Sequence, residues 1–396
     1  MKDENFVVPG FKASAVSAGL KKDGGLDMAL IYCDGEAVGA GVFTTNKVKA
    51  APVLLSQEHV RDGKVRAIVA NSGNANACTG PQGLSDARDT AAKVAREMGI
   101  GMEEVLVCST GVIGLPLDMS KVSRAIPKLV NGLSETRLAD VSRAIMTTDT
   151  FPKLSMREGR VGGKPFKVAG IAKGAGMIMP NMATMLCFML TDIQIDAQTL
   201  SRSLSGVVDR TFNRITVDGD TSTNDTVIIM ANGRASNGLL SKRDEEIFAH
   251  TLGEVAEELA TMIVRDGEGA TKLVKILVKG CPDEKSASKA AKTVGNSLLV
   301  KTALYGNDPN WGRIMAALGR AEIPLTEHLV DIWIGDVQIV SGGLGMGQLA
   351  EEKATEIMRK DAYDLTVHLN SGPFESYVWA CDLSHEYVSI NADYRT

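Results

Sequence analysis

The residues best suited to do chemistry lie in one stretch between Lys173 and Asp192, which reads KGAGMIMPNMATMLCFMLTD. Two glycines and a proline exclude a regular helix or strand from its first half, because glycine is conformationally loose and proline lacks an amide hydrogen. Residues 184–190 form a continuous apolar run of strand length, which is typical of a strand buried on both faces. Thr184 is therefore predicted to be the first residue of a buried strand, where its hydroxyl could serve as a nucleophile.

The residues alone leave two interpretations of this stretch open. In the first, it is an ordinary core strand whose threonine hydroxyl bonds a neighbouring backbone group, since a buried hydroxyl without a partner costs roughly 1–3 kcal/mol. In the second, Thr184 is a nucleophile held at the end of a strand. A membrane-spanning segment is excluded, because Pro180 and Asn181 interrupt the run and it is shorter than the ~20 residues that a span needs.

Two polar, glycine-containing loops directly follow predicted strands. The apolar run Val65–Ala70 leads into the loop NSGNANACTG, and the run Val105–Cys108 leads into the loop STGVIG. Loops in this position commonly carry site residues. The threonine hydroxyl and glycine amide of STGVIG could form an oxyanion hole, which stabilises a developing alkoxide. A turn or a helix cap is the structural alternative for these loops.

A third polar segment, DGDTSTNDT at Asp218–Thr226, is dense in carboxyl, hydroxyl and amide side chains. Its acids and glycine resemble the start of a calcium-binding loop. The glutamate that such a loop needs at its twelfth position is missing, so we set calcium aside. The segment is instead predicted to form a hydrogen-bonded wall of a site.

Five long motifs together resemble the ornithine acetyltransferase family of arginine biosynthesis, also called the glutamate N-acetyltransferase family. The motifs are KGxGM…PNMATML at Lys173–Leu186, NSGNANACTG at Asn71–Gly80, STGVIG at Ser109–Gly114, DGDTSTNDT at Asp218–Thr226 and YGNDPNWGRI at Tyr305–Ile314. The resemblance begins at VPGFKASAVSAGLK near the N-terminus and covers essentially the whole chain. It favours the interpretation of Thr184 as a nucleophile.

The resemblance implies that the chain cuts itself between Ala183 and Thr184. The hydroxyl of Thr184 would attack the Ala183 carbonyl to give an ester, which water opens. The products would be an α chain of residues 1–183 and a β chain of residues 184–396. The new α-amine of Thr184, whose unperturbed pKa is about 7.7–8.0, would then act as the general base.

The implied reaction moves an acetyl group between two amino acids. The donor N-acetylornithine would acetylate Thr184 and leave as ornithine, and glutamate would take the acetyl group to become N-acetylglutamate. No cofactor or metal is expected. Some family members also use acetyl-CoA as the donor, and no single residue resolves that question. The alternatives are an amidohydrolase or aminopeptidase with the same nucleophile, or a non-enzymatic scaffold.

The resemblance also assigns site residues. The oxyanion hole falls on Thr110 and Gly111. The substrate-binding positions are Thr150, Lys173, Thr184, Glu268, Asn391 and Thr396. A lysine suits the carboxylate of an acetylated amino acid, and a glutamate suits the side-chain ammonium of ornithine. Taken without the resemblance, Lys173 could be a snorkelling lysine and Glu268 an exposed turn acid.

The implied fold is α+β, of the DmpA/ArgJ-like self-processing type, with layered sheets and helices and the nucleophile at the start of a buried strand. An N-terminal lobe over residues 1–280 would carry the nucleophile. A C-terminal lobe over residues 281–396 would close the site with its tail. Family members assemble as dimers of αβ units, so a heterotetramer of two α and two β chains is expected.

Sequence periodicity predicts the elements that surround these loops. Apolar residues at helical spacing predict a helix near Leu84–Met98 and a long helix from Ser241 to Ile263, with a capping box between Ser241 and Asp244. A polar helical segment is predicted near Lys121–Met146. A strand is predicted over residues 166–172, running into the central loop.

The composition of the chain limits the classes of protein to which it can belong. The chain has 396 residues, which allows two or three lobes, and a net charge of −5 without a basic block, so nucleic acid is not an expected partner. Six scattered cysteines without a CxxC pair predict a reduced, cytoplasmic protein. The five histidines lack metal-binding spacing. The N-terminus has no apolar core of a signal peptide, and no membrane association is expected.

Overall fold

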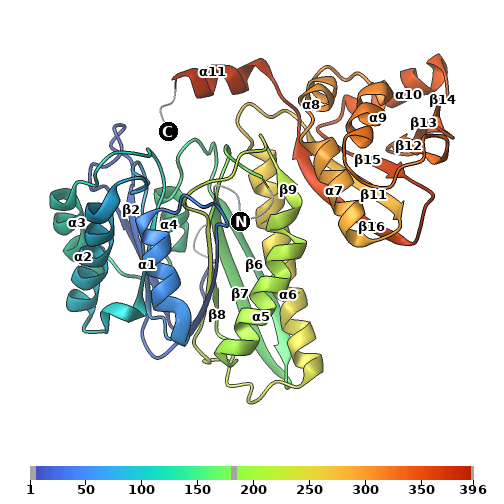
Figure 1. The fold of residues 1–396 in the computed structure, drawn as a ribbon. Helices are drawn as coiled ribbons and strands as arrows, with labels where there is room; N and C mark the ends of the chain where they lie inside the picture. Colours follow the sequence, from blue (N-terminus) through green and yellow to red (C-terminus); the bar gives the residue numbers. More distant parts are fainter. Residues whose placement is uncertain (1–5, 180–184, 394–396) are drawn as a thin grey trace.

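The computed structural model of the chain describes residues 6–179 and 185–393. Figure 1 shows a larger lobe, built mainly from the first two thirds of the chain, and a smaller lobe built from the last third. The hydrophobic core of the smaller lobe begins at Val274. The boundary near residue 280 stays a prediction. None of the described helices is long and apolar enough to cross a membrane.

Two facing sheets form the centre of the larger lobe. Among the described residues, the first sheet has the strand order β1-β2-β4-β5 and the second β3-β10-β8-β7-β6. The strands of the first sheet are β1 (Phe11–Val16), β2 (Met28–Cys33), β4 (Ala67–Asn71) and β5 (Val105–Ser109). Those of the second are β3 (Val38–Phe43), β10 (Thr226–Ala231), β8 (Leu186–Thr191), β7 (Lys164–Lys173) and β6 (Lys153–Val161).

Helices cover the outer face of each sheet and complete four layers. One hydrophobic core lies between the two sheets and includes residues of both. A second core lies under the helices of the first sheet, and a third under those of the second. The covering helices are α1 (Ala51–His59), α2 (Gly80–Met98) and α3 (Met119–Asn131) on the first sheet, and α5 (Ala197–Arg210) and α6 (Lys242–Arg265) on the second.

Strand β8 occupies the centre of the second sheet, parallel to β10 and antiparallel to β7. All of its residues are buried. Leu186, Phe188 and Leu190 face the core between the sheets. Cys187 and Met189 face the core under α5 and α6. The prediction of a strand buried on both faces is confirmed for residues 186–190, while position 184 lies outside the described residues.

Most predicted elements are confirmed. Helix α6 begins after Ser241, whose side chain and that of Asp244 form the predicted capping box. The predicted helix over residues 121–146 is wrong as a single element, because α3 ends at Asn131 and α4 (Leu138–Ala144) begins seven residues later. Between them the backbone of Ser134 pairs with Ala13 on β1, which takes the segment out of helical geometry.

The smaller lobe is built on a third sheet. Among the described residues its order is β14-β13-β12-β15-β11-β16-β9. Its strands are β14 (Leu344–Gly345), β13 (Val337–Ser341), β12 (Asp331–Ile334), β15 (Ala362–His368), β11 (Leu273–Cys281), β16 (Phe374–Cys381) and β9 (Ile215–Thr216). The helices α7 (Glu284–Gly295), α8 (Leu298–Tyr305), α9 (Trp311–Gly319) and α10 (Gln348–Met358) accompany it.

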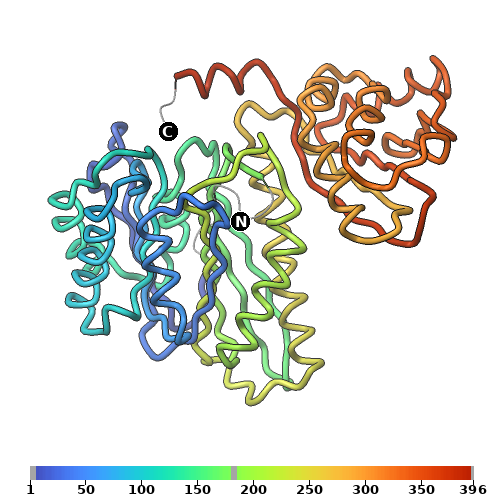
Figure 2. The backbone as a smooth tube through the Cα atoms, in the orientation of Figure 1, coloured from blue at the N-terminus to red at the C-terminus, as the bar shows by residue number. Residues whose placement is uncertain are grey.

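The last described element, α11 (His385–Asp393), connects the lobes in space. The path of the chain in Figure 2 shows it leaving the smaller lobe after β16 and running back above the larger one. Its Tyr387 hydroxyl donates to Asp218, and its Asn391 amide donates to Glu268. The end of the described chain therefore lies against loops of the larger lobe.

Candidate active site

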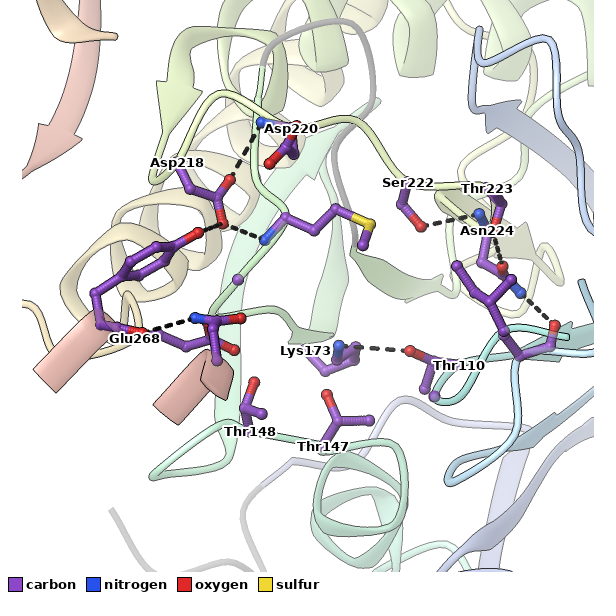
Figure 3. A pocket seen from close by; sticks show the side chains of 17 residues that line it. Thr110, Thr147, Thr148, Lys173, Asp218, Asp220, Ser222, Thr223, Asn224 and Glu268 are labelled. Atoms are coloured by element: carbon purple, nitrogen blue, oxygen red, sulfur yellow. Dashed lines mark hydrogen bonds between the residues drawn. The ribbon is translucent and has the colours of Figure 1, made fainter. Parts of the chain in front are cut away.

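A cavity of about 240 Å³ lies where the loops of the larger lobe meet α11 (Figure 3). It gathers polar residues from segments that are far apart in the sequence. Its lining consists of Ala75, Thr110, Gly111, Ile113, Thr147, Thr148, Lys173, Gly176, Met177, Asp218, Asp220, Ser222, Thr223, Asn224, Glu268, Tyr387 and Asn391. The structure thus brings five of the predicted site residues into one place.

The ends of neighbouring strands position these residues. Lys173 is the last residue of β7 and pairs with Leu186, the first residue of β8. On the other side of β8, Leu186 pairs with Thr226, the first residue of β10. The cavity therefore lies at the edge of the sheet where β8 begins. Ala183, Thr184 and Thr396 lie outside the described residues, and their roles stay predictions.

The predicted oxyanion pair follows β5 directly. Gly111 has a φ of +130°, and a Cβ atom there would lie 2.4 Å from the carbonyl carbon of Gly73, so only glycine fits. The hydroxyl of Thr110 accepts a 3.5 Å hydrogen bond from the Lys173 ammonium. Because an ammonium can only donate, the hydroxyl proton of Thr110 can be donated elsewhere.

Asn224 ties the loops of three motifs together. Its side-chain amide donates to the carbonyl of Ala75, at 2.7 Å, and to that of Ser109, at 2.8 Å. The 218–226 segment therefore anchors the loops after β4 and β5, and several of its residues line the cavity. This arrangement is the one expected of the predicted hydrogen-bonded wall. Among the described residues, no group of three or more His, Cys, Asp or Glu side chains could hold a metal ion.

Lys173 is a buried cation, with only 2% of its surface exposed. Burial lowers the pKa of Lys173, and the carboxylate of Asp149 opposes that shift. An ammonium group with so little contact with water gains strongly from a bound anion. The site can therefore bind a carboxylate next to Thr110.

Glu268 and Asn391 form the opposite side of the cavity. The Asn391 amide donates a 2.7 Å hydrogen bond to the Glu268 carboxylate, which joins α11 to the loop after α6. A Cβ atom on Gly176 would lie 2.5 Å from that carboxylate, so glycine allows the close approach. The second carboxylate oxygen can accept from a cationic group of a ligand.

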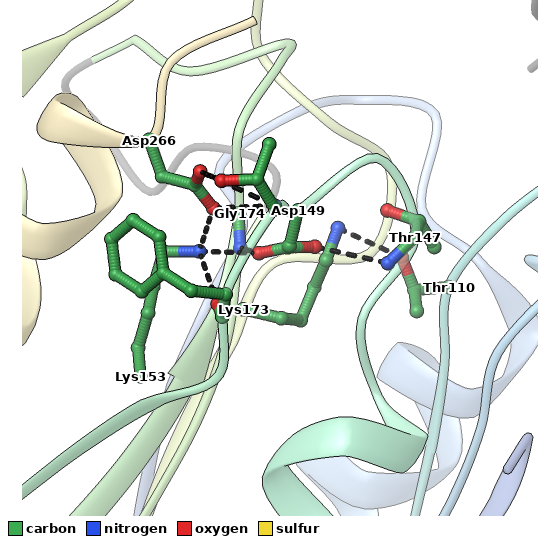
Figure 4. Close-up of polar contacts among 9 residues, drawn as sticks. Thr110, Thr147, Asp149, Lys153, Lys173, Gly174 and Asp266 are labelled. Atoms are coloured by element: carbon green, nitrogen blue, oxygen red, sulfur yellow. Dashed lines mark hydrogen bonds and ion pairs between the residues drawn. The ribbon is translucent and has the colours of Figure 1, made fainter.

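A buried ion cluster, formed by Asp149, Lys153 and Asp266, supports this side of the site (Figure 4). The Lys153 ammonium has no exposure and lies 2.7 Å from Asp149 and 2.5 Å from Asp266. Asp149 also accepts from the amides of Gly174 and Thr147. The cluster therefore links the loop after α4, the start of the 174–178 loop and the loop after α6.

The cluster also fixes the charge of Asp149. Burial disfavours the carboxylate of Asp149, but the ammonium groups of Lys173 and Lys153 outweigh it and lower the pKa of Asp149 to about 2. Asp149 is therefore ionised at neutral pH; it forms an ion pair with Lys153, and the charge of Lys173 stabilises its carboxylate from a greater distance. The carboxylate of Asp149 favours the charged form of Lys173, which lines the cavity.

Replacing Lys153 by methionine is expected to lower the free energy of unfolding by about 3–5 kcal/mol, because two buried carboxylates lose their shared cation. Urea denaturation at pH 7 measures the change. Lys167→Met is the matched control, since Lys167 lies half-exposed on β7 and pairs with the exposed Glu158. That change should cost at most about 1 kcal/mol. Equal losses in the two variants would contradict the structural role of the cluster.

The predicted substrate contact at Thr150 lies differently from the others. Its amide and hydroxyl both donate to Asp266, and it is not among the residues that line the cavity. Thr147 and Thr148, from the same TTDT sequence, line the cavity instead. A substrate role for Thr150 stays a prediction. In the structure its side chain joins the loop after α4 to Asp266 of the buried ion cluster.

Sequence reasoning missed Tyr387. Its hydroxyl donates a 3.3 Å hydrogen bond to Asp218. Asp218 also accepts from the amide of Ile178, at 2.8 Å, and so holds the loop that precedes residue 180. The spacing of the sequence could have indicated this residue, because Tyr387 and Asn391 are four residues apart and therefore share one helix face.

The larger lobe consists of two sheets packed face to face between helices. Threonine, lysine and carboxylate groups lie at one end of the strands. Together these features define an α+β protein with a polar small-molecule site. In the crystal structure of the arginine biosynthesis bifunctional protein ArgJ from Bacillus halodurans, one chain matches with a TM-score of 0.50 and 42% identity. The match covers 52% of this chain and 98% of that chain. The predicted layered α+β fold of the ArgJ type is confirmed.

The model of the ArgJ family matches residues 12–396, and the chain belongs to this family. A protein of Geobacter sulfurreducens named arginine biosynthesis bifunctional protein ArgJ is 54% identical, over 98% of this chain and 100% of its own length. A protein of Methanocaldococcus jannaschii named glutamate N-acetyltransferase is 49% identical, over 98% of this chain and 97% of its own length.

Proposed function

We propose that this chain is an acyltransferase of arginine biosynthesis that moves the acetyl group of N-acetylornithine to glutamate through an acetyl ester on Thr184. The observation that carries the proposal is the charge pattern of the cavity. Lys173 supplies a buried cation on one side, and Glu268 supplies a carboxylate on the other. Names of full-length relatives, such as the glutamate N-acetyltransferase of M. jannaschii, support the same reaction.

The charge pattern suits a substrate with an anionic and a cationic end. The α-carboxylate of N-acetylornithine would pair with Lys173, and its side-chain ammonium would pair with Glu268 and lie near Asn391. The acetyl carbonyl would then lie near Thr110 and Gly111. Glutamate has the same α-carboxylate and would bind Lys173 in the second half of the reaction.

In the proposed mechanism the α-amine of Thr184 removes the proton of its own hydroxyl. The oxygen attacks the acetyl carbonyl, and the resulting oxyanion accepts hydrogen bonds from the Thr110 hydroxyl and the Gly111 amide. The carbon–nitrogen bond then breaks, and the proton passes from the α-amine to the amino group of the departing ornithine. Glutamate reverses these steps with its own amino group.

The α-amine exists only after cleavage between Ala183 and Thr184, so the proposal includes self-cleavage. The half-length match to the B. halodurans chain supports it. Only 52% of this chain is needed to cover 98% of the chain in that crystal structure. The G. sulfurreducens relative, in contrast, matches this chain over its full length. Separate α and β chains cut from one precursor would give this pattern.

Acetyl-CoA is the second proposed acetyl donor for glutamate, since several relatives, including that of G. sulfurreducens, carry the word bifunctional in their names. We also propose that two α and two β chains assemble into a heterotetramer and that the enzyme works in the cytoplasm. These parts of the proposal rest on the family and not on the cavity.

The dependence of acetyl release on the acceptor tests the reaction. With N-acetylornithine and glutamate, ornithine and N-acetylglutamate should form in equal amounts. Without glutamate, ornithine should appear once per enzyme molecule, and the 184–396 chain should gain the mass of one acetyl group. Continuous ornithine release without glutamate would instead identify an amidohydrolase. A parallel assay with acetyl-CoA and glutamate tests the second donor.

A further inference from the structure

The segment that leads into α11 is held from two sides, and the mechanism above does not use this arrangement. The segment, here called the junction, comprises residues 381–384, from the last residue of β16 to the residue before α11. Positions 381 and 383 contact α8 of the smaller lobe. Positions 382 and 384 contact the loop after α6, which carries Glu268. Figure 1 shows α8 on the side of the smaller lobe from which α11 departs.

The contacts with α8 begin at Lys301. Its ammonium donates a hydrogen bond to the carbonyl of Cys381 and lies 3.7 Å from the sulfur of the same residue. The backbone carbonyl of Lys301 accepts a 3.2 Å hydrogen bond from the amide of Leu383. One turn later on α8, the ring of Tyr305 lies edge-on to the ring of His385, with 5.9 Å between the ring centroids. Helix α8 therefore holds the start of α11 at three points.

The contacts on the other side belong to the loop after α6. The side chain of Asp382 accepts hydrogen bonds from the amide of Thr271, at 2.8 Å, and from its hydroxyl, at 2.6 Å. The Ser384 hydroxyl donates a 2.6 Å hydrogen bond to the carbonyl of Gly269, the residue after Glu268. Gly269 has a φ of +67°, and a Cβ atom there would lie 2.7 Å from the Ser384 oxygen, so glycine permits this approach. The junction thus joins α8 to the loop that carries Glu268.

Helix α11 depends on such contacts for its position. It has nine residues, and none of its described side chains is buried. Isolated helices shorter than about 12–15 residues are marginal in water. It reaches the cavity through Tyr387, which donates to Asp218, and through Asn391, which donates to Glu268. Where the junction holds the start of the helix therefore decides where these two side chains lie.

Lys301 is a costly residue for a contact that only fills space. Just 1% of its surface is exposed. Removing an ammonium group from water costs free energy, and an apolar side chain of similar length would fill the same space without that cost. A buried lysine is thus weak evidence for stability and stronger evidence for fixing one arrangement. The arrangement that its ammonium fixes is the start of the junction.

We propose that Lys301, together with Tyr305, positions α11 and thereby completes the subsite for the side-chain ammonium of ornithine. This rests on the proposed function, in which Glu268 pairs with that ammonium and Asn391 lies near it. Neither Lys301 nor Tyr305 is among the described residues that line the cavity, so both act through the junction as positioning residues. The YGNDPNWGRI motif, which starts at Tyr305, gains a role in this way.

Ornithine binding to Lys301→Met provides the first test. Methionine has a similar length but cannot donate to the carbonyl of Cys381, so α11 should occupy its position in a smaller fraction of molecules. The apparent Kd of ornithine rises as that fraction falls, and calorimetry should show an increase of about tenfold or more. Tyr305→Leu removes the ring contact with His385 and should raise the Kd about threefold.

Leu299→Ala is the matched control for both variants. Leu299 lies on the same helix, but its side chain is 59% exposed and alanine keeps the helix intact. The Kd of ornithine should therefore match that of the wild-type protein.

Two further measurements separate positioning from a general loss of structure. In steady-state kinetics of Lys301→Met, KM for N-acetylornithine should rise while kcat changes little, because Thr110, Gly111 and Lys173 belong to the larger lobe and not to α11. Hydrogen exchange of the α11 amides should become faster, while the amides of β8 keep their protection. The urea midpoint should stay close to that of the wild type, since methionine removes a buried charge.

The outcomes are distinguishable. A wild-type Kd for ornithine in Lys301→Met, or unchanged exchange of the α11 amides, overturns the positioning role. A higher Kd that comes with a large drop in the urea midpoint, while Tyr305→Leu binds normally, also overturns it. If Lys301→Met does not fold, Tyr305→Leu decides alone, because Tyr305 is 38% exposed and lies outside the core. A wild-type protein that binds no ornithine would instead reject the proposed function itself.

Discussion

The Thr184→Ala chain is expected to remain a single species of 396 residues and to transfer no acetyl group. Alanine removes the only proposed nucleophile, and without cleavage no α-amine forms to act as the base. The two losses therefore have one cause. The intact mass under denaturing conditions is the first measurement, because the wild-type protein should give two species, residues 1–183 and 184–396.

Thr184→Ser is the matched control for this prediction. Serine keeps a hydroxyl at the same position, so the chain should still cut itself and transfer acetyl groups. A Thr184→Ala chain that still cut between residues 183 and 184 would show that another group is the nucleophile. An uncut wild-type chain of 42.0 kDa would mean that the chemistry must be explained without an α-amine.

The fold could be predicted where one short-range pattern decides the structure. The apolar run that contains β8 needs burial on both faces, and it is buried in the centre of a sheet. The apolar stripe and the capping box at Ser241 predict helix α6 from the sequence alone. The helix expected over residues 121–146 fails because Ser134 finds its hydrogen bonds on β1, and β1 lies about 120 residues away in the chain.

The site could be predicted only in part, for the same physical reason. The family resemblance identified Thr110, Lys173 and Glu268, which line one cavity. The burial of Lys153 could not be read from the sequence, because its partner Asp266 is 113 residues away and only the packing of α6 on β6 unites them. In the sequence it is an ordinary lysine that follows a proline.

The same limit applies to Asp225. Its place in the DGDTSTNDT segment suggests a wall of hydrogen bonds, and several neighbours fulfil that role. Its bond to Met185 becomes visible only once β10 lies beside β8. Local sequence therefore indicates which segments form the site, while tertiary pairing decides the charge that each group carries there.

Thr110→Ala is expected to lower kcat for acetyl transfer by about 100- to 1,000-fold, with little change in KM. The Thr110 hydroxyl accepts from Lys173 and can direct its own proton at the oxyanion, which exists only in the transition state. Removing that donor leaves the Gly111 amide to stabilise the charge alone. Steady-state kinetics with N-acetylornithine and glutamate measure both constants.

Thr110→Ser separates the hydroxyl from the rest of the side chain. Serine restores the donor, so kcat should return close to the wild-type value if hydrogen bonding to the oxyanion is the role of Thr110. A kcat that stays unchanged in Thr110→Ala would remove this residue from the oxyanion hole. A rise in KM with kcat unchanged would assign Thr110 to ground-state binding, through its contact with Lys173, because uniform binding affects substrate and transition state equally.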